Sequence, residues 1–95
     1  MKDLPYFYGD FKREEFLKLL YVINKIRLDT KNISSFYFFR SGRWDIKFRN
    51  GLILKLPNED LTNTLSRFLL LKNNQNFKNS KIIDLRIKNR IITND

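Results

Sequence analysis

The chain contains neither cysteine nor histidine. Without cysteine it can have no disulfide framework, no thiolate nucleophile and no thiolate metal site. Without histidine it lacks the commonest general base and the commonest metal ligand. Alanine is also absent and Val22 is the single valine, so a core must be built from leucine, isoleucine and phenylalanine. We therefore expect no enzymatic activity, no bound metal and no cofactor.

Long apolar runs are missing too. The longest uncharged apolar stretches, such as residues 68–71, are far too short to cross a bilayer. The N-terminus shows no basic segment followed by an apolar one, so no export signal is predicted. As written, the chain is expected to be soluble and to stay in the cytoplasm. With 95 residues and 42% hydrophobic side chains, residues 1–95 should form a single small domain with its own core.

The charge is strongly positive, with 19 Lys and Arg against 10 Asp and Glu, and a net charge of +9. Such a balance can attract the phosphates of nucleic acid or an anionic membrane surface. The basic residues are scattered, however, and no run is longer than two. We interpret them mainly as a solubilising surface. A small basic nucleic-acid-binding domain, with strand aromatics that stack on bases, remains the alternative function.

The first part of the chain has the pattern strand, helix, strand. Residues 4–8 are predicted to be extended and at a sheet edge or strand start because of Pro5, and Gly9 ends them. Asp10 is a plausible N-cap for a helix over residues 11–28. Its apolar residues recur at helical spacing: Phe16, Leu19, Leu20, Ile23 and Ile26. Residues 33–40 form an aromatic strand that is apolar on both faces, which indicates a central or covered strand.

Residues 43–57 read RWDIKFRNGLILKLP and predict a β-hairpin that turns at Asn50-Gly51. A two-residue turn would place the three leucines of the return strand on the face of Asp45 and Lys47. A three-residue turn, with Gly51 left-handed, gathers the apolar residues of both strands on one face. Its pairs are Phe48 with Leu52, Ile46 with Leu54, and Trp44 with Leu56. We predict the second register, because the first would expose three leucines.

The remaining segments predict a second helix and two more strands. Asn58 can cap a helix that has Glu59 and Asp60 at its positive end. The buried stripe of that helix is expected to be Leu61, Leu65, Phe68 and Leu69. Residues 73–79 form a polar loop with Phe77 as an anchor. Residues 81–87 form a strand, residues 88–89 a turn, and residues 90–93 the last strand. One face of the first of these strands should carry Ile83, Leu85 and Ile87.

The predicted fold class is therefore α+β, with an antiparallel β-sheet packed against two α-helices. Within that sheet Trp44 is expected to be a core residue. Asp45, beside Arg43 and Lys47, is expected to form a local cross-strand charge pair, worth at most about 1 kcal/mol if it is exposed. Asp45 and Asp84 are not expected to act as paired catalytic carboxylates, because no histidine, cysteine or third carboxylate accompanies them.

Four sequence motifs occur in the order and spacing of one known family. They are LPYFYG at residues 4–9, RWDI with Asn50-Gly51 and KLP at residues 43–57, Leu65 with Arg67-Phe68, and DLR at residues 84–86 with Arg90. Over nearly its whole length the chain resembles the C-terminal β domain of the FtsQ/DivIB bacterial cell-division proteins. Each motif is weak by itself, and the resemblance depends on all four together.

The resemblance implies a non-enzymatic scaffold of the divisome that binds FtsB-like and FtsL-like proteins. In that family a cytoplasmic tail, a transmembrane helix and a POTRA domain precede the β domain, which lies at the periplasmic face of the inner membrane. The present sequence lacks those segments and the first strands of the β domain. Membrane attachment is thus expected only through the missing N-terminal segments. Met1 is expected to begin either an engineered fragment or the remnant of a split gene.

The last strand is the best candidate for a binding site. A strand at a sheet edge has unpaired N–H and C=O groups, and a partner strand can add to it. Arginines beside that edge would attract an acidic partner. The resemblance implies strand addition by FtsB at this same end of the domain. The predicted partner-binding residues are Arg86, Ile87, Arg90, Ile91, Ile92 and Thr93. The alternative is a solvated basic face that only keeps the edge strand soluble. In isolation the chain is expected to be a monomer.

Overall fold

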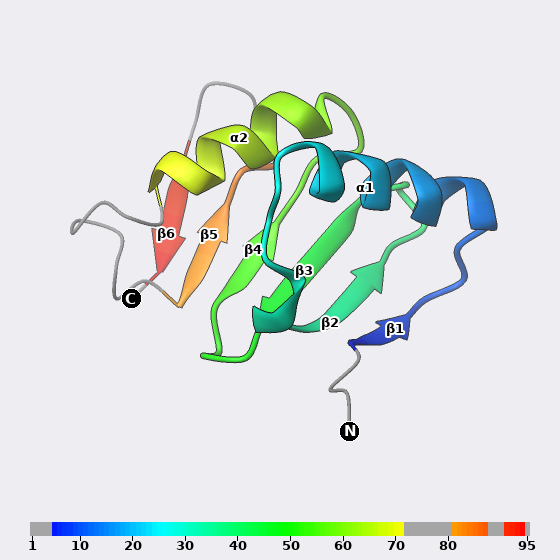
Figure 1. Ribbon diagram of the computed structural model, residues 1–95. Coiled ribbons are helices and arrows are strands. Elements are labelled where there is room, and N and C mark those ends of the chain that lie inside the picture. The colour runs from blue at the N-terminus through cyan, green and yellow to red at the C-terminus, as the bar shows by residue number, and fades with distance from the viewer. Residues whose placement is uncertain (1–4, 72–80, 88–90, 95) are drawn as a thin grey trace.

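The computed structural model describes residues 5–71, 81–87 and 91–94. It contains six strands, two α-helices and one short 3-10 helix (Figure 1). In chain order the elements are β1 (Tyr6–Tyr8), α1 (Arg13–Lys25), the 3-10 helix (Thr30–Asn32), β2 (Ile33–Phe38), β3 (Trp44–Phe48), β4 (Ile53–Lys55), α2 (Leu61–Leu71), β5 (Ile82–Asp84) and β6 (Ile92–Asn94). The α+β class and the two helices are confirmed.

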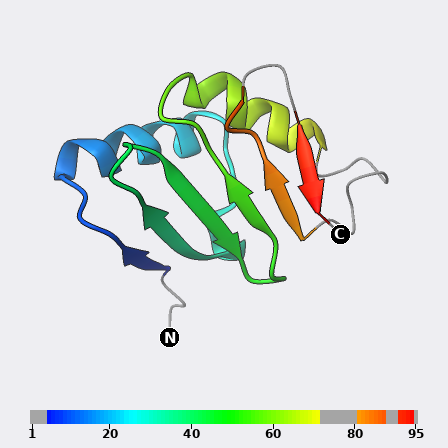
Figure 2. The ribbon, with the colours of Figure 1, turned by 180° about the vertical axis from the view of Figure 1, so that it is seen from behind.

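The six strands form one sheet in the order β1-β2-β3-β4-β5-β6. Both helices lie on the same face of the sheet, and the other face is open (Figures 1 and 2). The prediction of an antiparallel sheet is wrong in part. The sheet is mixed, because β1 pairs with β2 in parallel and β4 pairs with β5 in parallel. A helix joins the strands of each parallel pair and returns the chain to the end where the first strand began. β1 lies at an edge of the sheet, as predicted from the proline that precedes it.

The first helix is shorter than the predicted span of residues 11–28. It runs from Arg13 to Lys25, and Lys12, not Asp10, holds the N-cap position. The backbone N–H of Lys12 donates to the Glu15 carboxylate at 3.0 Å, which gives this helix start a side-chain partner. Phe11 packs against the core cluster. Because this packing holds the chain before Lys12, the helix cannot extend back to Asp10.

Within residues 5–71, 81–87 and 91–94, two residues other than glycine have a positive φ, and each stands at a helix end. Arg27, with φ 61°, follows α1. Across it the N–H of Leu28 donates to the carbonyl oxygen of Ile23 at 3.0 Å, which closes the last turn. This left-handed residue explains why α1 ends before the predicted residue 28.

The second helix also begins differently from the prediction. Asp60, with φ 57°, precedes Leu61, and its carbonyl oxygen accepts a hydrogen bond from the N–H of Thr64 at 3.1 Å. Asn58 is not the cap. Its side-chain amide instead donates to the carbonyl oxygen of Ser41 at 3.1 Å and ties the β2–β3 turn to this segment. The predicted stripe of α2 is confirmed, because Leu65 and Phe68 are buried and Leu61 and Leu69 pack against the core.

The predicted hairpin register is confirmed. Ile46 lies opposite Leu54, and the N–H of Phe48 donates to the carbonyl oxygen of Leu52 at 2.8 Å. Gly51 has φ 97°, as the three-residue turn requires. Five of the six apolar residues on the inner face are buried, and Leu52 packs against them. The alternation of apolar residues therefore predicted the register of β3 and β4 correctly.

The core lies between this inner face and the two helices. Trp44 is 2% exposed, and its ring lies 5.2 Å from that of Phe11 and 4.9 Å from that of Phe38. Phe48 stacks on Phe68 of α2 with ring centroids 5.4 Å apart. The aromatic residues thus join β2, β3 and α2, and the interpretation of Trp44 as a core residue is confirmed.

The strand predicted over residues 81–87 ends at Asp84. Ile83 and Leu85 are buried, but Ile87 is 51% exposed and does not share their face. The cause is local: the N–H of Arg86 donates to the Asp84 carboxylate at 3.0 Å, and this turn interrupts the strand. β6 starts at residue 92, not 90. The predicted Phe77 anchor and the turn at residues 88–89 lie outside the described residues.

Candidate partner-binding site on the edge and open face of the sheet

The hydrogen bonds between β4 and β5 determine how the backbone of β5 is oriented. The N–H of Ile53 donates to the carbonyl oxygen of Lys81 at 2.9 Å, and the N–H of Leu85 donates to that of Lys55 at 2.9 Å. Backbone polar groups alternate in direction along a strand. Ile83 therefore directs its N–H and C=O toward β4, and its two neighbours direct theirs toward β6.

The same alternation shows which backbone groups of β6 point away from β5. Asp84 lies opposite Ile92, and Thr93 lies opposite Ile83. Since Asp84 faces β6, Asp84 and Ile92 are a hydrogen-bonded pair, and the backbone of Thr93 points away from the sheet. β6 is the last strand of the sheet. Thr93 therefore presents one N–H and one C=O to the outside, where an added strand could bind them.

The structure brings together most of the residues that the sequence predicted for this site. Ile87, Ile91 and Ile92 are exposed, and Arg86 lies at the end of β5. Ile92 lies opposite Asp84, so both side chains are on the open face of the sheet. Arg90 lies outside the described residues. This end of the sheet thus combines exposed isoleucines with backbone groups that pair with no other described strand.

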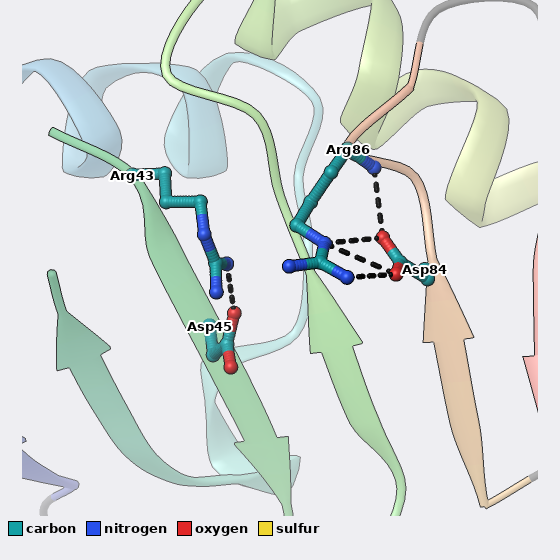
Figure 3. A network of polar contacts seen from close by, with 4 residues as sticks. All are labelled: Arg43, Asp45, Asp84 and Arg86. Carbon is teal, nitrogen blue, oxygen red and sulfur yellow. Dashed lines mark hydrogen bonds and ion pairs between the residues drawn. The ribbon is translucent and has the colours of Figure 1, made fainter. Parts of the chain in front are cut away.

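Next to the edge, the open face carries a group of charged residues that we call the open-face cluster. Asp45 on β3 lies opposite Lys55 on β4, which in turn lies opposite Asp84 on β5. Arg43 and Arg86 complete the cluster. Figure 3 shows Arg43 with Asp45 at β3 and Arg86 with Asp84 at β5, with β4 between the two pairs. Three cations and two carboxylates make this part of the face net positive.

Arg86 and Asp84 form a bidentate ion pair. The Nε of Arg86 donates to Oδ1 of Asp84 at 2.9 Å, and its Nη2 donates to Oδ2 at 2.6 Å. Asp84 is only 7% exposed. The hydrogen bond from the Arg86 side chain lowers the pKa of Asp84 and outweighs desolvation, which would raise it. The same hydrogen bond raises the pKa of Arg86.

The guanidinium of Arg86 keeps donors for a further partner. A guanidinium has five N–H groups in a fixed plane. Figure 3 shows one of its terminal nitrogens directed away from Asp84, with no dashed line to the residues drawn. Asp84 therefore holds the cation in one orientation while leaving part of it accessible. Such a cation can accept a second carboxylate without having to be ordered first.

The second arginine of the cluster is held in a similar way. Nη1 of Arg43 lies 2.5 Å from Oδ1 of Asp45, and its guanidinium lies 4.3 Å from the centre of the Phe39 ring. Asp45 is buried and its partner is Arg43, two residues before it, so the expected charge pair is local, but it is not cross-strand and it is largely enclosed. Asp45 and Asp84 each have their own arginine, with Lys55 between them. This is an arrangement of ion pairs and not two carboxylates that share a proton.

The depressed pKa of Asp84 predicts how stability depends on pH. A carboxyl group whose pKa is lower in the folded state stabilises the fold above its ordinary value of 3.8, and this contribution is lost as the pH falls through the folded pKa. Asp84→Asn should reduce the unfolding free energy near neutral pH by about 1–3 kcal/mol. The difference from wild type should shrink in urea titrations well below pH 3.8. Asp10→Asn, at an exposed position, is the control. A constant difference at all pH values would contradict the role given to the ion pair.

The sequence interpretation missed Lys55 and treated Arg43 and Asp45 as a local pair. The predicted hairpin register already places Asp45 opposite Lys55. That half of the cluster could therefore have been found from the sequence. The other half depends on the parallel pairing of β4 with β5, which no local pattern indicates.

Comparison with known proteins gives one finding on the family and one on individual proteins. The family described as "Cell division protein FtsQ/DivIB, C-terminal" matches residues 1–86. No single curated protein gives a significant match. Within the described residues, neither helix has the length and apolar character needed to cross a membrane. Since the match covers most of its length, the chain belongs to the FtsQ/DivIB C-terminal family of cell-division proteins.

Proposed function

We propose that this chain is a non-enzymatic scaffold module of the divisome that binds an FtsB-like segment by strand addition to β6. The observation that carries the proposal is the outward backbone of Thr93, beside exposed Ile92 and the oriented cation of Arg86. Residues 86, 87 and 90–93 form the proposed contact. An FtsL-like protein would join the same assembly, at the periplasmic face of the inner membrane in the parent protein.

The nucleic-acid alternative has no specific support. Two of the cations on the open face, Arg43 and Arg86, already hold carboxylates. The family match concerns cell division and does not favour nucleic-acid binding. Salt separates the two modes, because phosphate binding falls steeply with ionic strength whereas strand pairing depends mainly on backbone hydrogen bonds.

Binding through the edge can be tested at Thr93 itself. Thr93→Pro removes the outward N–H, whereas Thr93→Ala keeps it. Titration with an acidic peptide able to form a strand should show a loss of about 1–3 kcal/mol for the proline variant and little change for the alanine variant. Proline at Ile92 would be a poorer choice, because that N–H points toward β5. Equal affinities of the two folded Thr93 variants would exclude this edge and direct attention to β1.

The contribution of Arg86 needs a paired substitution. Reversing its charge alone would put two carboxylates together and confuse binding with stability. The double variant Asp84→Asn with Arg86→Gln removes both charges, a change that is milder for the fold than removing one. If the Arg86 cation contacts the acidic peptide, the double variant binds more weakly while its thermal melt stays close to wild type. Arg90→Glu extends the same test to the last predicted cation.

A further inference from the structure

A groove on the helical side of the molecule has no part in the proposed strand addition. It has a volume of about 600 Å³ and runs between α1 and residues 58–62 at the start of α2. Its apolar lining comes from Leu17, Tyr21, Val22 and Leu61. The helices cover one face of the sheet, and the open-face cluster lies on the other (Figures 1 and 3). A ligand in the groove would therefore not compete directly with a partner on the open face.

Two large apolar side chains of this groove face solvent. Leu17 is 45% exposed and Tyr21 is 65% exposed, one turn apart on α1. The floor is closed by Val22, which is buried in the core. When the groove is empty, these apolar side chains are in contact with water. Their burial by a partner would remove that apolar surface from water and would therefore be favourable. The geometry suits a few apolar side chains of an incoming segment.

The charge around the groove is opposite to that of the whole chain. Three of the ten acidic residues line it, namely Glu14, Glu59 and Asp60, but only one of the nineteen basic residues, Lys18. Asp60 already accepts a hydrogen bond from the side chain of Asn63 at 2.9 Å. Neither Glu14 nor Glu59 has a hydrogen bond or ion pair with any other residue that the structure describes. The rim therefore carries two carboxylates that form no ion pair with any described residue, and only Lys18 offsets part of their charge.

We propose that this groove binds an amphipathic segment of a partner protein with apolar residues on one side and Lys or Arg beside them. The apolar residues would cover Leu17 and Tyr21, and the cations would lie next to Glu14 and Glu59. An anionic membrane is a poor occupant, since its phosphates would meet the carboxylates of the rim. A second copy would bring a net charge of +9 toward another +9, which opposes self-association.

The probes for the test are two helical peptides of about 14 residues with the same stripe of leucines, one with lysine and one with glutamate at the other positions. NMR titration of the ¹⁵N-labelled chain should map the lysine peptide to α1 and the start of α2. Leu17→Ser should weaken its binding by about tenfold, whereas Leu70→Ser, at another exposed leucine, should leave it unchanged. The double variant Glu14→Lys with Glu59→Lys should weaken it similarly, and Asp10→Lys should not.

Three results would overturn the proposal. The first is equal affinity for the lysine and glutamate peptides, and the second is equal behaviour of Leu17→Ser and Leu70→Ser. The third is a dimer of the wild-type chain in sedimentation that Leu17→Ser abolishes, because the groove would then hold a second copy. The Thr93→Pro variant should still bind the lysine peptide. This separates failure of the groove from failure of the proposed function at β6.

Discussion

Replacing Trp44 with alanine is expected to lower the unfolding free energy by about 3–5 kcal/mol. Trp44 is 2% exposed, and its ring packs with three aromatic residues, one before α1 and two on β2, so truncation leaves a cavity that its neighbours cannot fill. Small domains are stable by only about 5–15 kcal/mol, so the variant should be largely unfolded at moderate temperature. Urea unfolding followed by circular dichroism measures the loss.

Tyr21→Ala is the matched control, since Tyr21 is an aromatic residue on α1 that is mostly exposed. It should change the unfolding free energy by less than about 1 kcal/mol. A Trp44→Ala variant as stable as Tyr21→Ala would mean that Trp44 does not hold the sheet. Binding of the acidic peptide by a folded Trp44 variant would still be informative, because Trp44 is not part of the proposed contact.

Gly9→Val is expected to be nearly as damaging, at about 2–5 kcal/mol. Gly9 has φ +107°, a conformation that residues with a side chain rarely adopt. A Cβ at this position would also lie 2.3 Å from the carbonyl oxygen of Phe38. Because that atom belongs to the backbone of β2, relief requires β1 and the start of α1 to move.

Gly51→Val separates the two causes. Gly51 has φ +97°, but no described atom lies within 4 Å of the Cβ it would acquire. Only the backbone strain remains, and the expected loss is about 1–2 kcal/mol. Thermal melts of both variants give the comparison. If Gly9→Val costs no more than Gly51→Val, the close approach to Phe38 is not important for stability.

The central hairpin could be predicted because its signal is local and strong. Alternating apolar residues on both strands permit one register that buries them all, and Gly51 allows the required turn. The stripe of α2 was predictable for the same reason, since helical spacing marks the face that packs on the sheet. Where apolar residues recur with the period of a strand or a helix, the sequence predicts which face of that element is buried.

The parts that were not predicted depend on competing local contacts or on distant ones. Asp10 and Asn58 are good capping residues, but the packing of Phe11 and the hydrogen bond to Ser41 move the helix starts past them. Ile87 fits the alternation of β5, yet the turn formed by Asp84 and Arg86 ends the strand first. The parallel pairing of β4 with β5, and with it the open-face cluster, depends on where α2 delivers the chain.

The order of the strands in the sheet is the same as their order along the chain. Each strand therefore finds its partner after closing only one turn or one helix-containing loop, and no pairing has to wait for a remote segment. Folding rates fall as contacting residues become more distant in sequence. We expect rapid folding that starts at the β3–β4 hairpin and spreads toward both edges, with β1 and β6 added last.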